Sequence, residues 1–243
     1  MVILPLIGLV LRVPWSSLGS DLREHDALAA LRLSLETSLG ALGLSTVLGV
    51  PLAWVLARHQ FAGRSLVRAV VTLPMVLPPV VGGIALLYAF GRRGPVGAIL
   101  YDLTGWRLVF NTSGAIVAEA FVSMPFLVVT AESAFRSMDR RVEEAAATLG
   151  AGPAYRFRRV TLPAVAPALA AGAALTWARA LGEFGATITF AGNFPGTTQT
   201  TPLLVYLDIE SGREGTALAL SLVLLGVSLA VLVGLRDRWL GHP

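Results

Sequence analysis

The residues of this sequence that could act on another molecule fall into two groups. The first is a polar stretch over residues 143–163, set in a chain that is otherwise apolar. The second is Arg179 and Glu183, four residues apart in an apolar run, with Thr176 and Thr187 continuing the helical spacing. Ionisable side chains inside a membrane span are costly, and they usually serve a function. Arginine offers a rigid fork of donors for the oxygens of a tetrahedral dianion, and Glu183 would moderate that attraction. Alternatively, the two charges neutralise each other and lock the span to a neighbour.

The polar stretch has the pattern of two short helices joined by a tight turn. Asp139 is a predicted N-cap, and apolar residues recur at i, i+3, i+4 and i+7 over the ten residues that follow it. Gly150 suits the left-handed end of this first helix, and Pro153 suits the first turn of the second. Pro163 and Pro167 are predicted to end the second helix before the chain enters the membrane. The pattern therefore predicts a helical hairpin at the membrane surface.

Composition places the whole chain in a membrane. Of its 243 residues 55% are hydrophobic and 14% charged, and the mean hydropathy is +0.71, which predicts one polytopic membrane domain over residues 1–243. The net charge is +4, and all 19 basic residues are arginine. This balance indicates cytoplasmic loops rather than nucleic-acid binding, because no soluble basic domain is present. The chain has no cysteine, so disulfides and Cys-ligated metals are excluded, and no metal site is predicted.

The elements that must position these residues are about six membrane helices. The first apolar run, Val2 to Val13, would give about 18 Å of helix against a hydrocarbon core of roughly 30 Å. It is expected either to continue into polar flanks or to be the end of a longer span that the start codon clips. The other five spans are expected near residues 27–57, 66–90, 115–135, 166–191 and 216–235, with polar connectors at 14–26, 91–114 and 192–215.

Two features of these spans bear on function. The third span contains five Pro or Gly residues, Pro78 and Pro79 among them, and is predicted to be bent or interrupted. The fourth carries Glu119 and Glu132 near its ends, where they are expected to reach the interface. With both termini inside, eleven arginines lie on the side of the polar stretch and seven on the other. This bias predicts that the polar stretch is cytoplasmic.

The spacing in the polar stretch resembles the EAA signature of permease subunits of binding-protein-dependent ABC importers. Glu144-Ala145-Ala146 is followed after three residues by Gly150, and after nine more by Val160, Thr161 and Leu162-Pro163, with Val where the signature usually has Ile. The resemblance implies a type I ABC importer permease fold with a core at about 30–235. It also implies that residues 136–165 form the coupling helix that docks on a dimer of a cytoplasmic ABC ATPase. The coupling residues would be Glu144, Ala145, Ala146, Gly150, Val160, Leu162 and Pro163. A surface hairpin without this purpose is the alternative.

A second resemblance concerns the substrate. Residues 178–187 and 190–203, which include Pro195-Gly196-Thr197-Thr198-Gln199-Thr200, are similar to molybdate permeases. Sulfate and thiosulfate permeases share the core from Arg179 to Gly185, so those substrates are the alternative. Leu73-Pro74, residues 77–81 and residues 90–95 resemble the same oxyanion group. The resemblance implies a homodimer in the cytoplasmic membrane that receives molybdate or tungstate from an extracytoplasmic oxyanion-binding protein; both termini are expected inside from the arginine bias. The pathway residues would be Thr176, Arg179, Glu183, Thr187, Pro78 and Pro79.

The sequence contains no Gly-rich phosphate loop of the nucleotide-binding type, so ATP must be bound by another subunit. We therefore expect a transport subunit in contact with membrane lipid, with no catalytic residues and no cofactor of its own. A secondary transporter or channel driven by an ion gradient is a third hypothesis. It would draw on the intramembrane Arg179 and Glu183, and it would treat the spacing of the polar stretch as accidental.

Overall fold

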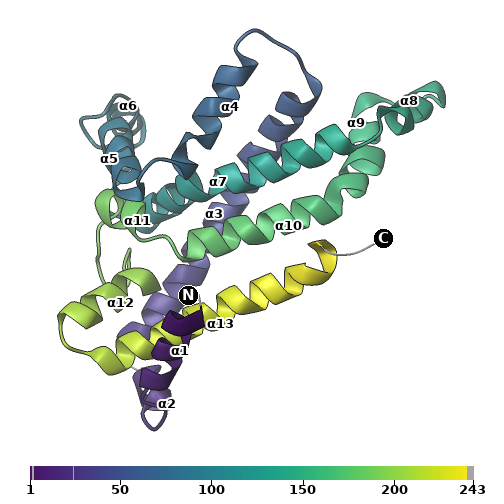
Figure 1. The fold of residues 1–243 in the computed structure, drawn as a ribbon. Coiled ribbons are helices and arrows are strands. Elements are labelled where there is room, and N and C mark those ends of the chain that lie inside the picture. The colour runs from purple at the N-terminus through teal and green to yellow at the C-terminus, as the bar shows by residue number, and fades with distance from the viewer. Residues whose placement is uncertain (2, 24, 240–243) are drawn as a thin grey trace.

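The computed structural model describes residues 1, 3–23 and 25–239, and every regular element in that part of the chain is helical (Figure 1). The elements are α1 Ile3–Arg12, α2 Leu18–Asp21, α3 His25–Arg58, α4 Arg64–Thr72, the 3-10 turn η1 Leu73–Met75, α5 Pro79–Phe90, α6 Pro95–Thr104, α7 Thr112–Ser137, α8 Arg140–Thr148, α9 Pro153–Arg156, the π-helical turn η2 Phe157–Thr161, α10 Leu162–Leu181, α11 Gly185–Phe190, α12 Thr201–Glu210 and α13 Glu214–Trp239. The all-α class predicted from the sequence is confirmed.

Most of the expected spans are present. Within the described residues, four helices are long and apolar enough to cross a membrane: α3, α7, the continuous run Pro153–Leu181, and α13. A fifth span is formed by α4, η1 and α5 if this pair, bent by 117°, is counted as one. The first expected span corresponds to α1, which has ten residues and buries none of them. Val2, where that span was expected to begin, lies outside the described residues.

The core is organised around α7, which packs along α3 and α10 (Figure 1). Helix α13 lies along the other side of α10. Small residues let α3 and α7 come close: a Cβ added to Gly40 would lie 2.9 Å from Cδ1 of Ile116, and one added to Gly49 would lie 3.1 Å from Cγ2 of Val128. Leu56 of α3 and Phe135 of α7 are fully buried in the cluster nearest α8. Helix α7 therefore connects both ends of the bundle.

Two interrupted helices meet at the end of the bundle opposite α8. The span containing α4 breaks before Pro79, and three residues separate the end of α10 at Leu181 from the start of α11 at Gly185. Helices α5 and α11 then pack closely, through glycines on both helices. A Cβ added to Gly83 would lie 1.7 Å from Thr189 Oγ1 and 2.8 Å from the carbonyl oxygen of Ala186. Gly185 likewise lies against Pro79, whose Cβ would be 2.9 Å from an added Cβ. The predicted interruption of the third span is thus confirmed, and it has a partner in the fifth.

The three polar connectors contain the short helices α2, α6 and α12. Apolar side chains of α6, Ile99 among them, are exposed. The fifth span ends at Leu181, not at residue 191, because Gly182 and the cap of α11 interrupt it. Glu119 and Glu132 are buried, at 1% and 6% exposed, because neighbouring helices pack over both ends of α7.

A second correction concerns Pro163. It does not end the second hairpin helix, since α9, η2 and α10 form one helical run. Pro163 lacks an N–H, and its ring would clash with the carbonyl of Arg159 in a regular helix. Arg159 lies within the π-helical turn η2, whose wider register accommodates that loss.

Candidate functional site

The hairpin formed by α8 and α9 projects from one end of the bundle (Figure 1). Its first helix starts as predicted, because the Asp139 side chain accepts a hydrogen bond of 2.9 Å from the backbone N–H of Arg141. It ends in a Schellman motif: Gly150 has φ +85°, its N–H donates to Ala147, and the N–H of Ala151 donates to Ala146. The turn therefore requires the left-handed conformation that the sequence assigned to Gly150.

Glu143 ties this hairpin to the bundle. Its Oε1 accepts a hydrogen bond of 3.0 Å from Nη2 of Arg58, at the end of α3, and one of 2.6 Å from the hydroxyl of Thr161, at the base of α10. The Arg58 side chain is only 9% exposed. A cavity of about 380 Å³ lies beside this contact and is also lined by Trp54 and Phe157, whose rings meet edge to face. Sequence reasoning selected Glu144 and missed Glu143, because the partners of Glu143 are distant in the chain.

The side chains predicted to couple to a partner lie at the outer surface of the hairpin. Glu144 and Ala145 are exposed, Val142 is 50% exposed and Leu149 88% exposed, whereas Ala146 is half-buried. The apolar face predicted for α8 is therefore open over most of its length. Val160 lies in η2, and Leu162 and Pro163 form the start of α10. The structure thus places the predicted coupling residues in one surface-exposed hairpin and its root.

The intramembrane pair forms the contact that its spacing predicts. Nη2 of Arg179 lies 2.6 Å from Oε2 of Glu183, and the other oxygen of Glu183 accepts a 2.9 Å hydrogen bond from the backbone N–H of Ala186. Glu183 is 1% exposed, whereas the Arg179 side chain is 31% exposed. Because both oxygens of Glu183 have partners, this carboxylate is part of the junction between α10 and α11. Arg179 retains donors that face accessible space.

The structure does not place all predicted pathway residues on one helical face. Thr176 lies in α10 and Thr187 in α11, beyond the break after Leu181. Both are fully buried, and neither hydroxyl has a hydrogen-bond partner among the described residues. Pro78 and Pro79 lie at the other break, and Pro79 packs against Gly185. The structure therefore brings Pro79 and the Glu183 segment together at the meeting point of the two interrupted helices.

Glu119 of α7 is a buried polar residue close to Thr37 of α3. Its Oε1 accepts a hydrogen bond of 2.8 Å from Thr37, and its Oε2 is buried without a partner in the described part of the chain. Ser123, one turn further along α7, is also fully buried with an unpartnered hydroxyl. Unpaired buried polar groups are rare and costly. In the sequence, this buried polar pair is marked only by a carboxylate and a hydroxyl four residues apart in an apolar helix.

The Thr-rich segment that resembled molybdate permeases is buried. Thr198, Gln199 and Thr200 are at most 4% exposed. The Thr198 hydroxyl accepts a hydrogen bond from the N–H of Phe194, and Thr201 is paired with Ser34 of α3 through two hydrogen bonds of 3.0 and 2.7 Å. The segment therefore connects α11 and α12 to α3 and holds their packing.

Comparison with known proteins gives the family. Residues 49–242 match the family described as binding-protein-dependent transport system inner membrane component. The molybdenum transport system permease protein ModB of Mycobacterium tuberculosis is 44% identical over 98% of this chain and 89% of that protein. ModB of Escherichia coli is 42% identical, covering 88% of this chain and 93% of that protein. A sulfate transport system permease protein, CysT of Salmonella typhimurium, is 35% identical over 97% of this chain and 86% of its own length.

Solved structures give the same fold. A chain of a bacterial alginate ABC transporter, crystallised with an alginate-bound periplasmic protein, superposes with a TM-score of 0.71 at 20% identity, covering 95% of this chain and 85% of that one. A chain of the inward-facing MetNI methionine ABC transporter superposes with a TM-score of 0.61 at 18% identity, covering 87% and 95%. The chain thus belongs to the family of binding-protein-dependent transport system inner membrane components, and it has the fold of a type I ABC importer permease.

Proposed function

We propose that this chain is the membrane-spanning subunit of an ABC importer that carries molybdate across the cytoplasmic membrane. The observation that supports molybdate as the substrate is the order of the sequence identities. The ModB permeases of Mycobacterium, Escherichia coli and Haemophilus influenzae are 41 to 44% identical to this chain, and a probable molybdenum permease of Haloferax volcanii is 38% identical. Two sulfate permeases are 34 and 35% identical. Family membership also favours ATP-driven import over transport by an ion gradient.

The α8–α9 hairpin is the element through which ATP hydrolysis acts. In this proposal the exposed Val142, Glu144, Ala145 and Leu149 dock into a partner ATPase, and small side chains on α8 let the two backbones come close. The supporting geometry is an apolar helix face that this chain leaves open, on a hairpin that Glu143 fastens to α3 and α10. ATP is bound and hydrolysed by that partner, and this chain contributes no catalytic residue or cofactor.

The pathway passes the meeting point of α5 and α11. Interrupted helices at membrane depth leave backbone N–H groups free, and the amino ends of such helices favour anions. Helix α5 begins at Pro79 beside this point, and Arg179 is the partly exposed cation near it. Glu183, with both oxygens engaged, holds the junction between α10 and α11 in shape and does not itself contact the ion.

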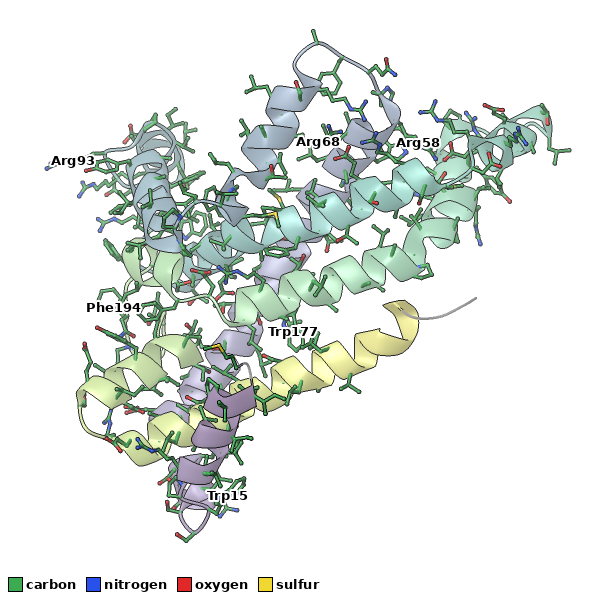
Figure 2. All side chains as sticks on the ribbon, in the orientation of Figure 1. Trp15, Arg58, Arg68, Arg93, Trp177 and Phe194 are labelled. Atoms are coloured by element: carbon green, nitrogen blue, oxygen red, sulfur yellow. The ribbon has the colours of Figure 1, made fainter. Side chains whose placement is uncertain are left out.

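The assembly would contain two copies of this chain, two ATPase subunits and an extracytoplasmic oxyanion-binding protein. The alginate-transporter chain comes from a complex with a periplasmic protein, which supports this kind of partner. The arginine bias supports a cytoplasmic hairpin, which places the end carrying Arg93 outside (Figure 2). Closure of the ATPase pair would then draw two hairpins together and rock the two permease units between inward-facing and outward-facing states.

The proposal is tested by uptake in cells that lack their own molybdate and sulfate importers. The chain is expressed with its partner ATPase and binding protein, and uptake of radiolabelled molybdate and sulfate is measured with and without the unlabelled competitor. Saturable molybdate uptake that excess sulfate leaves in place supports the proposal. Sulfate uptake that supports growth on sulfate alone, with no molybdate uptake, would establish the second candidate, which the sulfate permease of Salmonella typhimurium favours.

A further inference from the structure

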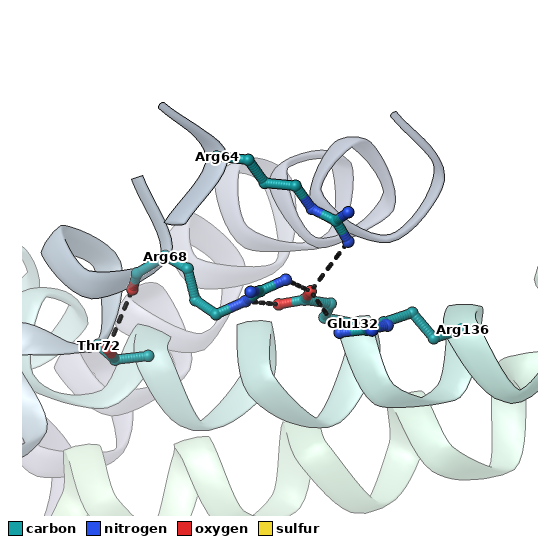
Figure 3. Close-up of polar contacts among 5 residues, drawn as sticks. All are labelled: Arg64, Arg68, Thr72, Glu132 and Arg136. Atoms are coloured by element: carbon teal, nitrogen blue, oxygen red, sulfur yellow. Dashed lines mark hydrogen bonds and ion pairs between the residues drawn. The ribbon is translucent and has the colours of Figure 1, made fainter. Parts of the chain in front are cut away.

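Three arginines surround one buried carboxylate where α4 meets α7 (Figure 3). Glu132 of α7 is 6% exposed. Arg68 of α4 engages both of its oxygens, through Nε to Oε2 at 3.1 Å and through Nη2 to Oε1. Nη1 of Arg136 and Nη2 of Arg64 lie 3.6 and 3.8 Å from Oε1. We call these four residues the Glu132 cluster.

The charges in the Glu132 cluster do not balance. One carboxylate faces three guanidinium groups, and Arg68 alone satisfies both carboxylate oxygens in a bidentate pair. The distances to Arg64 and Arg136 are those of ion pairs, longer than hydrogen bonds. In addition, Nε of Arg64 is buried and has no hydrogen-bond partner among the described residues. The cluster therefore carries two surplus positive charges and an unsatisfied buried donor.

A pocket of about 350 Å³ opens beside these groups. It is lined by Arg64, Arg68 and Arg136, together with the polar Gln60 and Ser65, and by Phe61, whose side chain is 41% exposed. A tetrahedral oxyanion in this pocket would accept hydrogen bonds from Arg64 and Arg136 without displacing Arg68 from Glu132. An apolar ring beside the guanidinium groups matches a ligand that has apolar chains next to its phosphate.

The position of the cluster along the helices fits a lipid headgroup. Arg64 is the first residue of α4, and Arg136 is the last but one of α7. On the other face of α4, Leu66 and Val70 are 67% and 59% exposed, as expected for side chains that face hydrocarbon. The cluster thus lies where these membrane helices end, on the side of the α8–α9 hairpin. Basic pockets between membrane helices at this level bind the headgroups of anionic lipids.

We propose that the Glu132 cluster binds the phosphate of an anionic phospholipid from the leaflet on the α8–α9 side. Arg64 and Arg136 hold the phosphate, and Arg68 remains the partner of Glu132. Because Arg64 belongs to the bent α4–α5 pair and Arg136 to α7, the lipid would fasten the two to each other close to the start of the hairpin.

The test measures lipid affinity on the assembled transporter by native mass spectrometry, with phosphatidylglycerol and phosphatidylcholine as probes. The double variant R64Q/R136Q removes both proposed phosphate ligands. The matched control R23Q/R93Q removes two exposed arginines at the other end of the bundle. Loss of two arginines near the membrane surface is expected to lower phosphatidylglycerol affinity roughly 30-fold. A third variant, Glu132→Gln, leaves three guanidinium groups for the phosphate and should tighten binding.

The proposal requires that wild type prefers phosphatidylglycerol, that R64Q/R136Q abolishes the preference, that R23Q/R93Q keeps it and that Glu132→Gln strengthens it. Equal loss in the two double variants would overturn it, because the effect would then follow net charge. Binding of millimolar phosphate or molybdate to the cluster, with no preference between the lipids, would also overturn it and would assign the pocket to a free oxyanion. An unchanged preference in R64Q/R136Q would place the lipid elsewhere.

Discussion

The sharpest prediction concerns Glu143, the residue that fastens the α8–α9 hairpin to the bundle. Glu143→Ala leaves the buried hydroxyl of Thr161 without its acceptor and the Arg58 guanidinium, 9% exposed, without its counter-charge. An orphaned buried hydroxyl costs about 1–3 kcal/mol, and a buried charge that loses its partner costs about 3–5 kcal/mol. The adjacent cavity of about 380 Å³ admits water to Arg58, so the total should be about 3 kcal/mol. The population of undocked hairpin should therefore rise roughly a hundredfold.

Hydrogen exchange of the α8 amides measures this population directly, since opening of the hairpin exposes them. Glu143→Ala should accelerate that exchange roughly a hundredfold. Glu144→Ala should leave it unchanged, because Glu144 is exposed and does not take part in the contact with Arg58 and Thr161. Unchanged exchange in Glu143→Ala would refute the reasoning, whatever the transported ion. In vesicles containing the partner ATPase and binding protein, both variants should take up less molybdate per ATP hydrolysed, Glu143→Ala through a loosened hairpin and Glu144→Ala through a lost partner contact.

Three further predictions follow from the structure. Gly83→Ala should lower the yield of folded protein, since its Cβ would lie 2.8 Å from a backbone carbonyl of α11 and overpacking costs about 1–3 kcal/mol; yield is measured by gel filtration in detergent. Gly150→Val should reduce uptake per ATP, because φ +85° costs an L-residue roughly 1–2 kcal/mol and a β-branched one more. A hydrogen bond with Arg107, helped by nearby guanidinium charge, lowers the pKa of Tyr101. Ionisation of Tyr101 should therefore raise the free energy of unfolding as pH rises from that lowered pKa to the ordinary tyrosine pKa. Arg107→Gln should raise the pKa of Tyr101, measured by the absorbance of the phenolate.

The two glycine predictions have matched controls. Gly226→Ala adds the same methyl group in α13 where nothing lies within 4 Å, and should leave the yield unchanged. Gly152→Val lies in the same hairpin as Gly150 but at φ −68°, which any residue adopts. Equal uptake by the two valine variants would contradict the turn argument. For Tyr101, a titration of the Arg107→Gln protein that coincides with wild type would contradict the assigned cause.

Local rules predicted the hairpin well. The Asp139 cap, the left-handed Gly150 and the start of α9 at Pro153 depend only on a few neighbouring residues, and all three are found. The same local rules wrongly predicted a helix end at Pro163, because they assume the hydrogen-bond pattern of a regular α-helix. The π-helical turn η2 supplies another register, and no pattern in the sequence announces it.

Long-range packing could not be predicted from the sequence. Glu143, Glu119 and Glu132 acquire their roles from Arg58, Thr37 and Arg68, which are 64 to 85 residues away in the chain. A carboxylate in a membrane span indicates that it has a hydrogen-bond or ion-pair partner, but the sequence does not identify that partner. The break after Leu181 could not be predicted for a related reason. Glycine is tolerated within a helix, and the interruption at Gly182 is held by a hydrogen bond from the backbone N–H of Ala186 in α11 to Oε1 of Glu183.

The unbroken run from Pro153 to Leu181 has a mechanical consequence. Its 29 residues form a rod about 44 Å long. Near its first end, the helix is held at Thr161 by the hydrogen bond to Glu143. Its other end carries Arg179 and lies next to the start of α11. If the helix pivots at the contact between Thr161 and Glu143, a tilt of about 10° moves Leu181, roughly 30 Å from Thr161, by about 5 Å. A displacement of about 5 Å is comparable to one turn of an α-helix. A small tilt at the surface hairpin would therefore move the Leu181 end far enough to open or close a passage for a single ion.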